Sequence, residues 1–182
     1  MLRTAGAQAR AWQEAGISSM RICINISQRQ LAQHDFPDDV HRILNETGCD
    51  PHIFELEITE SCVMDRPDHV IAKLQALHEM GIKLSLDDFG TGYSSLGYLK
   101  RFPLDRLKID RSFVAGLPED SSDIAIVQTT IVLARHLGLS VVAEGVETEA
   151  QQRLLKAYGC HEMQGYLLGK PLPAEELEKI FE

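Results

Sequence analysis

The chain has 182 residues, of which 44% are hydrophobic and 25% charged, and its formal net charge is −9 at pH 7. These values are typical of one globular domain, and the lack of a membrane-spanning apolar run or signal-peptide core predicts a cytoplasmic protein without direct membrane insertion. The acidic balance argues against a nucleic-acid polymer as partner, because such a partner requires a basic stripe.

Short strand-like runs alternate with helical stretches along the chain. After a helix expected at Met1–Trp12, the predicted strands cover residues 21–26, 53–59, 82–87, 105–110, 139–144 and 160–165. Thr148 and Gln151 have the spacing of a capping box at the start of a later helix. Strands that alternate with helices indicate a parallel sheet, built either as an open doubly wound sheet or as a barrel.

The two faces of the predicted strands differ in polarity, and this difference separates the two architectures. One face is apolar, as in Ile22, Ile24 and Ile26. The other face carries Arg21, Cys23, Asn25, Glu55, Glu57, Thr59, Lys83, Ser85, Asp87, Arg106, Lys108, Asp110, Ser140, Glu144, Glu162 and Gln164. An open sheet between two helix layers would bury these polar groups at a large desolvation cost. The sequence therefore favours a barrel whose polar interior pairs charges and admits a ligand.

Each predicted strand ends in a polar residue that lies on the polar face, which every second residue of the strand shares. These residues are Asn25, Glu57, Asp87, Lys108 with Asp110, Glu144 and Gln164, and Asp88 follows as the third strand breaks into a loop. In a (β/α) barrel the carboxyl ends of the strands surround one mouth, where the fold places its active site. Oxygen donors without His or thiolate suit Mg²⁺ or Mn²⁺, and two such ions would offset the repulsion among the acids and support phosphoester hydrolysis.

Each of these residues also has an ordinary structural interpretation. Adjacent acids before a glycine-rich loop are common in turns and helix caps. Lys108 with Asp110, or Lys108 with Glu57, could equally form ion pairs that fill a barrel. The agreement in parity among six predicted strand ends is what favours a metal site.

Several ordered motifs resemble the EAL-domain family of phosphodiesterases, which hydrolyse the bacterial second messenger cyclic di-GMP. They are INIS at 24–27, ELEITES at 55–61, DDFGTGYSSL at 87–96, LKID at 107–110, AEGVET at 143–148 and QGYLLGKPL at 164–172. The resemblance implies that residues 1–182 form an EAL-type domain of about six βα units with an α/β, TIM-like barrel fold. The first strands of that barrel, with the Glu-Ala-Leu segment and one metal-ligating Glu, are absent.

The resemblance also implies a role for each matched residue. The implied metal ligands are Asn25, Glu57, Asp87, Asp88, Asp110 and Glu144. The implied catalytic residues are Glu144, as general base, and Lys108, which would position water. Substrate contacts fall to Gln164 and Asp88, and support of the site and its loop to Glu60, Glu147, Gly90, Thr91, Gly92 and Ser94. The implied reaction uses two Mg²⁺ or Mn²⁺ ions and opens cyclic di-GMP to linear pGpG.

The expected partners follow from the same resemblance. They are cyclic di-GMP, a second copy in a homodimer coupled through the Gly90–Ser95 loop, and an upstream sensory or diguanylate-cyclase domain. The alternative is a catalytically inactive receptor for cyclic di-GMP. Such receptors usually lose metal-site residues, and the competent residue at every matched position favours the enzyme, while the absent Glu favours the receptor for this chain.

Overall fold

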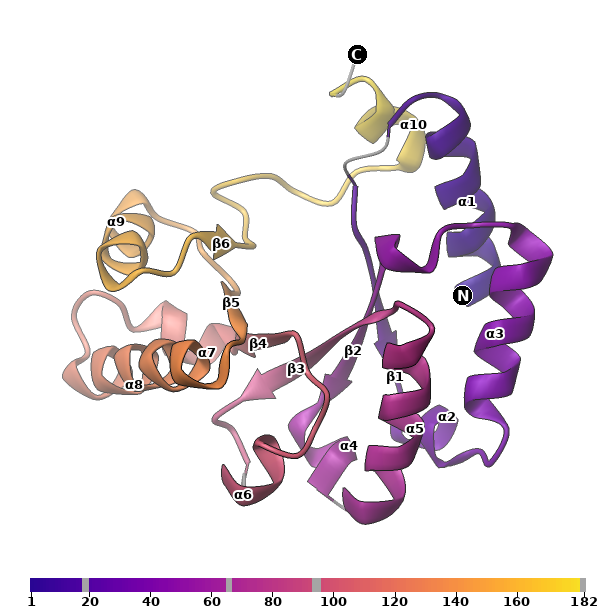
Figure 1. Ribbon diagram of the computed structural model, residues 1–182. Helices are drawn as coiled ribbons and strands as arrows, with labels where there is room; N and C mark the ends of the chain where they lie inside the picture. The colour runs from indigo at the N-terminus through magenta and orange to yellow at the C-terminus, as the bar shows by residue number, and fades with distance from the viewer. Residues whose placement is uncertain (18–19, 65–66, 93–95, 181–182) are drawn as a thin grey trace.

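The computed structural model describes residues 1–17, 20–64, 67–92 and 96–180, and shows one parallel sheet curled into a half-barrel (Figure 1). Its strands are β1 (Ile22–Ile26), β2 (Phe54–Thr59), β3 (Lys83–Phe89), β4 (Arg106–Ile109), β5 (Ser140–Ala143) and β6 (Glu162–Met163). They lie in sequence order, each parallel to the next. No ladder joins β6 to β1 within these ranges, which agrees with the predicted incomplete barrel.

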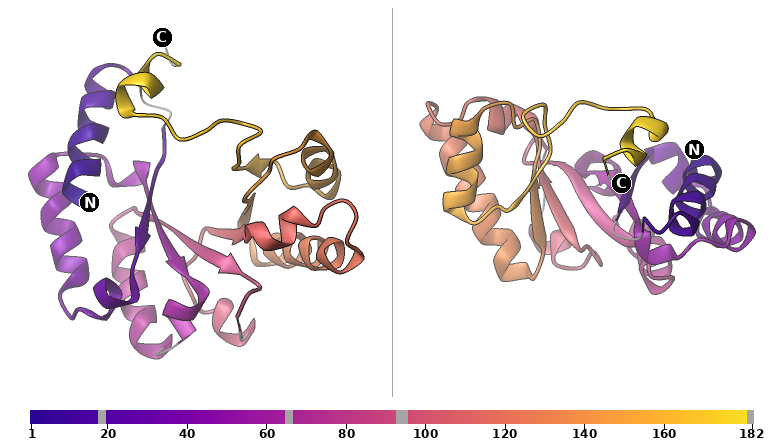
Figure 2. Two further views of the ribbon diagram at one scale, coloured as in Figure 1. Left: turned by 180° about the vertical axis from the view of Figure 1, so that it is seen from behind. Right: turned by 90° about the horizontal axis from the view of Figure 1, so that it is seen from above.

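The helices follow the strands in turn, and α3, α5, α8 and α9 lie outside the curl of the sheet (Figures 1 and 2). The helices are α1 (Leu2–Glu14), α2 (Gln28–Ala32), α3 (Phe36–Thr47), α4 (Glu60–Met64), α5 (Pro67–Glu79), α6 (Leu96–Leu99), α7 (Arg111–Ala115), α8 (Ser121–Leu137), α9 (Glu149–Tyr158) and α10 (Ala174–Glu178). A short 3₁₀ turn at Pro51–Ile53 precedes β2. This order of elements is the predicted alternation of strands and helices.

Residue parity decides which side of the sheet each strand residue faces. The apolar parity is buried under the helices, as at Leu56, Leu84 and Leu107, which are fully buried. The opposite parity faces the concave side and supplies the buried polar residues Glu55, Glu57, Ser85, Asp87, Arg106 and Lys108. Burying these charges is tolerable only because they pair with one another there. The predicted polar interior is confirmed.

Local signals account for several element ends, and the third and sixth strands differ by more than one residue at an end from prediction. The capping box is present, because Gln151 N donates to Thr148 Oγ1 at 3.2 Å and Thr148 N donates to Gln151 Oε1 at 3.0 Å. The third strand does not stop at Asp87 but continues to Phe89. The sixth covers only Glu162–Met163 rather than 160–165, because the chain leaves the open edge of the sheet at once.

Helix α10 lies beside the C-terminal end of α1 (Figures 1 and 2). Trp12 Nε1 on α1 donates to Glu178 Oε1 on α10 at 2.7 Å, and Gln8 Nε2 lies 3.3 Å from the same oxygen. The segment between β6 and α10 therefore crosses from the last strand to α1 (Figure 1). Among the helices of the described ranges, none combines the length and apolar character needed to cross a membrane.

Candidate metal and catalytic site

Lys108 is the centre of a buried cluster of carboxylates at the carboxyl ends of the strands. Its Nζ lies 2.5 Å from Glu144 Oε1, 2.8 Å from Glu57 Oε1 and 3.3 Å from Asp87 Oδ1. Burial alone would lower the pKa of Lys108, but the hydrogen bonds to Glu144 and Glu57 raise it above its ordinary value. The side chain is therefore a permanent ammonium at neutral pH, able to donate hydrogen bonds but not to accept a proton.

A β-bulge brings the adjacent acids Asp87 and Asp88 to the same site. Leu86 pairs with Leu107 and Phe89 with Ile109, so two residues of β3 stand opposite the single residue Lys108. A bulge kinks the strand and redirects side chains that would otherwise point to opposite faces. Asp88 takes the left-handed conformation, with φ of 55°, which Asp tolerates better than most residues. The bulge explains how both neighbours serve one site.

Asp88 and Asp110 face each other at the rim of this cluster. Burial raises the pKa of Asp88, and the negative charges of Asp87 and Asp110 raise it further. Asp110 also caps α7, because its Oδ1 accepts from Ser112 N at 3.0 Å and from Ser112 Oγ. Burial would raise the pKa of Asp110, but hydrogen bonds from Ser112 and from the Arg111 backbone outweigh it and lower the pKa. Asp110 therefore stays ionised beside an acid that resists ionisation.

Glu144 follows β5 and differs in its electrostatics from Asp110. Burial raises its pKa, and the hydrogen bond from Lys108 only partly offsets this effect. A carboxylate that holds a proton more tightly than usual, yet stands 2.5 Å from a permanent cation, is suited to accept a proton during a reaction.

The six residues Glu57, Asp87, Asp88, Lys108, Asp110 and Glu144, which we call the site layer, suit a divalent metal. Asp87, Asp88 and Glu144 offer oxygens that all lie within 4.8 Å of one another. The layer contains five carboxylates and one ammonium, so it carries an excess of negative charge when all are ionised. Hard oxygen donors with this excess fit Mg²⁺ or Mn²⁺ better than Zn²⁺.

Asn25 and Gln164 stand on the two edges of the open sheet. Asn25 is exposed on β1 and pairs in register with Glu57 on β2. Gln164 follows β6, where its backbone N–H donates to Ala143 O at 2.8 Å, and its side chain is also exposed. Alternation along the strands assigns both amides to the concave face, and their roles in binding stay predictions.

Glu60 holds the loop that follows β3. It is 2% exposed, and its Oε2 accepts from Gly90 N at 3.0 Å. A Cβ at Gly92 would lie 2.9 Å from Glu60 Oε1, so a side chain there would displace this carboxylate. Thr91 Oγ1 donates to Asp88 O at 2.8 Å, which links the loop to the bulge. Ser94, the remaining predicted loop residue, lies outside the described residues.

Glu147 is exposed beyond β5, where its backbone N–H donates to Gln151 Oε1 at 2.8 Å. This contact belongs to the start of α9 rather than to the site layer. The supporting role of Glu147 stays a prediction.

Sequence reasoning missed a second set of ion pairs beneath the site layer. It consists of Arg21, Glu55, Arg106 and Glu162, which we call the ring layer. The available signal was parity, because Glu55 and Arg106 precede Glu57 and Lys108 by two residues on the same strands. Parity placed them on the concave face, but only the structure shows how they pair.

Cys23, Glu55 and Glu57 form another group of possible ligand atoms, on β1 and β2. Burial, followed by the charges of Glu55 and Glu57, raises the pKa of Cys23 to about 12. Both carboxylates already face cations, since Glu55 contacts Arg106 and Glu57 contacts Lys108. This group therefore needs a metal less than the site layer does.

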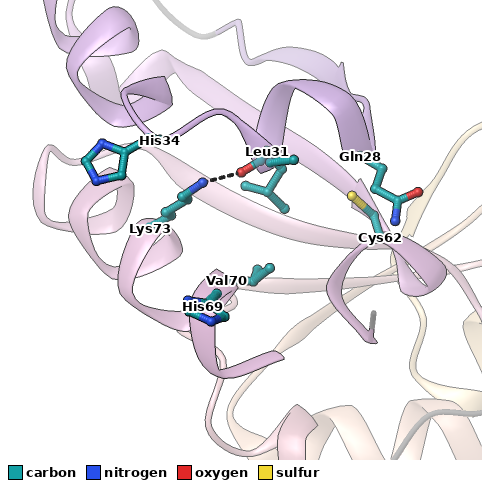
Figure 3. A pocket seen from close by; sticks show the side chains of 8 residues that line it. Gln28, Leu31, His34, Cys62, His69, Val70 and Lys73 are labelled. Atoms are coloured by element: carbon teal, nitrogen blue, oxygen red, sulfur yellow. Dashed lines mark hydrogen bonds between the residues drawn. The ribbon is translucent and has the colours of Figure 1, made fainter. Parts of the chain in front are cut away.

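A cavity of about 490 Å³ lies elsewhere, between α2, α4 and α5 (Figure 3). Its lining residues are Gln28, Leu31, Ala32, His34, Cys62, His69, Val70 and Lys73. Lys73 Nζ donates to Leu31 O at 2.7 Å and to Gln33 O at 2.6 Å, so its ammonium holds the end of α2. None of the predicted site residues lines this cavity, and the converging carboxylates make the site layer the better candidate.

Comparison with known proteins agrees with this geometry. A family model described as EAL domain matches residues 1–171. The chain belongs to the EAL domain family.

Two relatives come from Pseudomonas aeruginosa. The bifunctional diguanylate cyclase/cyclic di-GMP phosphodiesterase MucR is 48% identical over 170 residues, covering 93% of this chain and 25% of MucR. The cyclic di-GMP phosphodiesterase NbdA is 43% identical over 180 residues, covering 99% of this chain and 23% of NbdA.

Solved EAL domain structures share the fold. The PaMucR phosphodiesterase in complex with c-di-GMP matches with a TM-score of 0.94 and 47% identity, over 97% of this chain and 71% of that one. A manganese and cyclic di-GMP complex of Klebsiella pneumoniae BlrP1 matches with a TM-score of 0.81 and 32% identity, over 91% of this chain and 42% of that one. This EAL domain chain spans about a quarter of the length of the curated relatives it matches.

Proposed function

We propose that this chain is the larger part of a metal-dependent phosphodiesterase that opens cyclic di-GMP to linear pGpG. The observation that carries the proposal is the site layer, in which Glu57, Asp87 and Glu144 contact the ammonium of Lys108, and oxygens of Asp87, Asp88 and Glu144 lie within 4.8 Å of one another. The printed names of MucR and NbdA, and the c-di-GMP complex of PaMucR, support the same substrate.

The residues that would hold two Mg²⁺ or Mn²⁺ ions are Asn25, Glu57, Asp87, Asp88, Asp110 and Glu144. Such ions lower the pKa of water and stabilise charge on phosphoryl oxygens. The manganese complex of BlrP1 supports the choice of ion class. In metal-free protein Lys108 neutralises part of the carboxylate charge.

Four side chains of this chain would serve the reaction directly. Lys108, which stays protonated, would orient the attacking water or neutralise a phosphoryl oxygen. Glu144 would accept the proton of that water, in keeping with its raised pKa and its position beside Lys108. Gln164 would contact the substrate together with Asp88, from the opposite edge of the concave face.

The proposal extends to the assembly in which the domain works. We propose a cytoplasmic homodimer whose subunits communicate through the Gly90–Ser95 loop, and a sensory or diguanylate-cyclase domain in the full protein. Support comes from the Glu60–Gly90 hydrogen bond, which joins that loop to the site, and from the bifunctional name of MucR.

Turnover of cyclic di-GMP with Mg²⁺ or Mn²⁺, followed by chromatography of the products, tests the proposal. The assay should compare this chain with a form extended at its N-terminus, and Asp87→Asn should abolish pGpG formation in both. Calorimetric binding of the nucleotide by the extended form, without any pGpG, would overturn the enzyme and support the receptor alternative.

A further inference from the structure

Four charged residues of the ring layer form a closed ring of ion pairs on the concave face. Arg106 places Nη1 3.2 Å from Glu55 Oε2 and Nη2 2.7 Å from Glu162 Oε2. Arg21 Nη1 lies 3.3 Å from the same oxygen of Glu55 and 3.6 Å from that of Glu162. Each arginine thus contacts both glutamates, and the two positive charges balance the two negative ones.

The ring spans the side on which the sheet is open. Arg21 directly precedes β1 and Glu162 begins β6, the two strands that no ladder joins in the described part of the chain. Glu55 lies on β2 and Arg106 on β4. Side chains therefore connect the first strand to the last one, across the gap that backbone hydrogen bonds would close in a complete barrel.

Arg106 is the member that joins most strands. Besides Glu55 on β2 and Glu162 on β6, it donates from Nε to Ser140 Oγ on β5 at 3.0 Å. Its side chain is 9% exposed and that of Glu55 is 2% exposed, so their contact is shielded from water, whereas Glu162 is half exposed. A planar guanidinium can hold three partners in fixed directions, whereas a lysine ammonium is a single point charge on a flexible stem.

The ring layer and the site layer share two strands. Glu55 and Glu57 are separated by one residue of β2, and Arg106 and Lys108 by one residue of β4. Between these strands, β3 contributes the small and fully buried Ser85, which pairs in register with Glu57 on one side and Arg106 on the other. Because these strand segments are rigid, the strand separations that the ring layer sets also determine the strand separations in the site layer.

We propose that Arg106 is a positioning residue for the metal site. By holding β2, β5 and β6 at fixed separations, it sets the distance between ligands on the β1–β2 side, Asn25 and Glu57, and those on the β5–β6 side, Glu144 and Gln164. This inference rests on the proposed function, because it assigns the ring to the same metal site. It adds a residue that touches neither metal nor substrate.

Arg106→Lys tests the proposal most sharply, since it keeps the positive charge and removes the planar guanidinium that holds three partners. We expect Mn²⁺ affinity, measured by titration calorimetry, to fall about tenfold, which is typical when a partner behind metal ligands is lost. Arg101→Lys is the matched control, because Arg101 pairs with exposed Asp68 at 2.8 Å outside the half-barrel, and its Mn²⁺ affinity should not change. Unchanged affinity of Arg106→Lys would overturn the proposal.

Arg106→Gln separates positioning from simple electrostatics. Removing a positive charge near a cation site should strengthen Mn²⁺ binding by Coulomb's law, whereas loss of positioning should weaken it. Weaker binding supports the proposal. Tighter binding would give Arg106 a purely electrostatic role and overturn it.

Hydrogen exchange provides a readout that does not depend on the metal. In metal-free Arg106→Lys, peptides covering residues 21–26 and 160–165 should exchange faster than in the wild type, while α8 should not change. If residues 21–26, residues 160–165 and α8 all exchanged at the wild-type rate in the variant, the positioning role would be overturned. A wild-type chain that binds no Mn²⁺ would count against the proposed function alone, and the exchange of Arg106→Lys would still decide the role of the ring.

Discussion

The site layer and the ring layer occupy neighbouring levels of one concave face but differ in charge balance. The ring layer has two arginines for two glutamates, so its formal charge is zero. The site layer has one ammonium for five carboxylates, so its formal charge is −4 when all of them are ionised. Two divalent cations would neutralise that charge, whereas the ring layer has no charge left for a cation to neutralise.

This difference shows what marks a binding site among buried charges. Both layers have a Glu on β2 paired with a cation on β4, at 3.2 Å for Arg106 and 2.8 Å for Lys108. Burial and pairing are therefore common to both. The excess of carboxylate oxygens, together with the bulge that adds Asp88, is specific to the site layer.

The largest effect should come from Lys108→Met in metal-free protein. The change leaves three carboxylates, Glu57, Asp87 and Glu144, without their shared cation, and removal of one partner from a buried pair costs about 3–5 kcal/mol. Denaturant unfolding in EDTA measures this loss. Added Mn²⁺ should restore part of the stability, because the ion supplies the missing positive charge.

Lys83→Met is the control for this change. Lys83 pairs with Asp105 at 2.6 Å near the other end of β3, but its side chain is 45% exposed, so solvent screens the pair. We expect a cost of about 0–1 kcal/mol and no response to Mn²⁺. Equal losses in the two variants would show that Lys108 is an ordinary structural cation.

The sequence predicted the strands, their alternation with helices and the concave polar face, because parity depends on local spacing alone. It also placed Glu57, Asp87, Lys108 and Glu144 near one mouth. It could not show the bulge at Asp87 and Asp88, since the register shift depends on how β3 pairs with β4. Nor could it show the pairing within the ring layer, which depends on the curl of the whole sheet.

Metal binding should depend on pH in a defined direction. Asp88 and Glu144 have raised pKa values in the folded protein, so they stabilise the metal-free fold below about pH 4 and lose this contribution as the pH rises through their folded pKa values. Protons compete with Mn²⁺ for the same oxygens. At an Mn²⁺ concentration of 100 times Kd the midpoint of thermal unfolding should rise by about 5–10 °C at pH 8, and by less at pH 5.

Asp88→Asn is the matched variant, because it keeps the shape of the side chain but removes one of the titrating groups. Its Mn²⁺-dependent rise in unfolding temperature should vary less between pH 5 and pH 8. Equal pH dependence in both proteins would remove Asp88 from the metal site.

At Asp88 in the bulge, a Gly variant should be more stable than an Ala variant, which is the reverse of the usual order of stability. Because Asp88 has a φ of 55°, metal-free Asp88→Gly should be more stable than Asp88→Ala by about 1 kcal/mol. At Asp87, whose φ is not positive, Gly should be the less stable by about 0.5–1 kcal/mol. Urea unfolding of the four variants checks both signs. The same order at both positions would contradict the bulge.

The smallest effect should come from the exposed arginine of the ring layer. Arg21 contacts the same two oxygens as Arg106, but its side chain is 44% exposed against 9%. Solvent screening should limit the cost of Arg21→Gln to about 0–1 kcal/mol, whereas Arg106→Gln should cost about 3–5 kcal/mol. Raising the salt from 50 to 500 mM should remove most of the stability cost of Arg21→Gln and little of the cost of Arg106→Gln, as urea unfolding would show. Two arginines with the same two glutamate partners would then differ in effect through burial and through the bond from Arg106 to Ser140. Equal costs would instead mean that spanning the gap between β1 and β6 sets the strength of each contact.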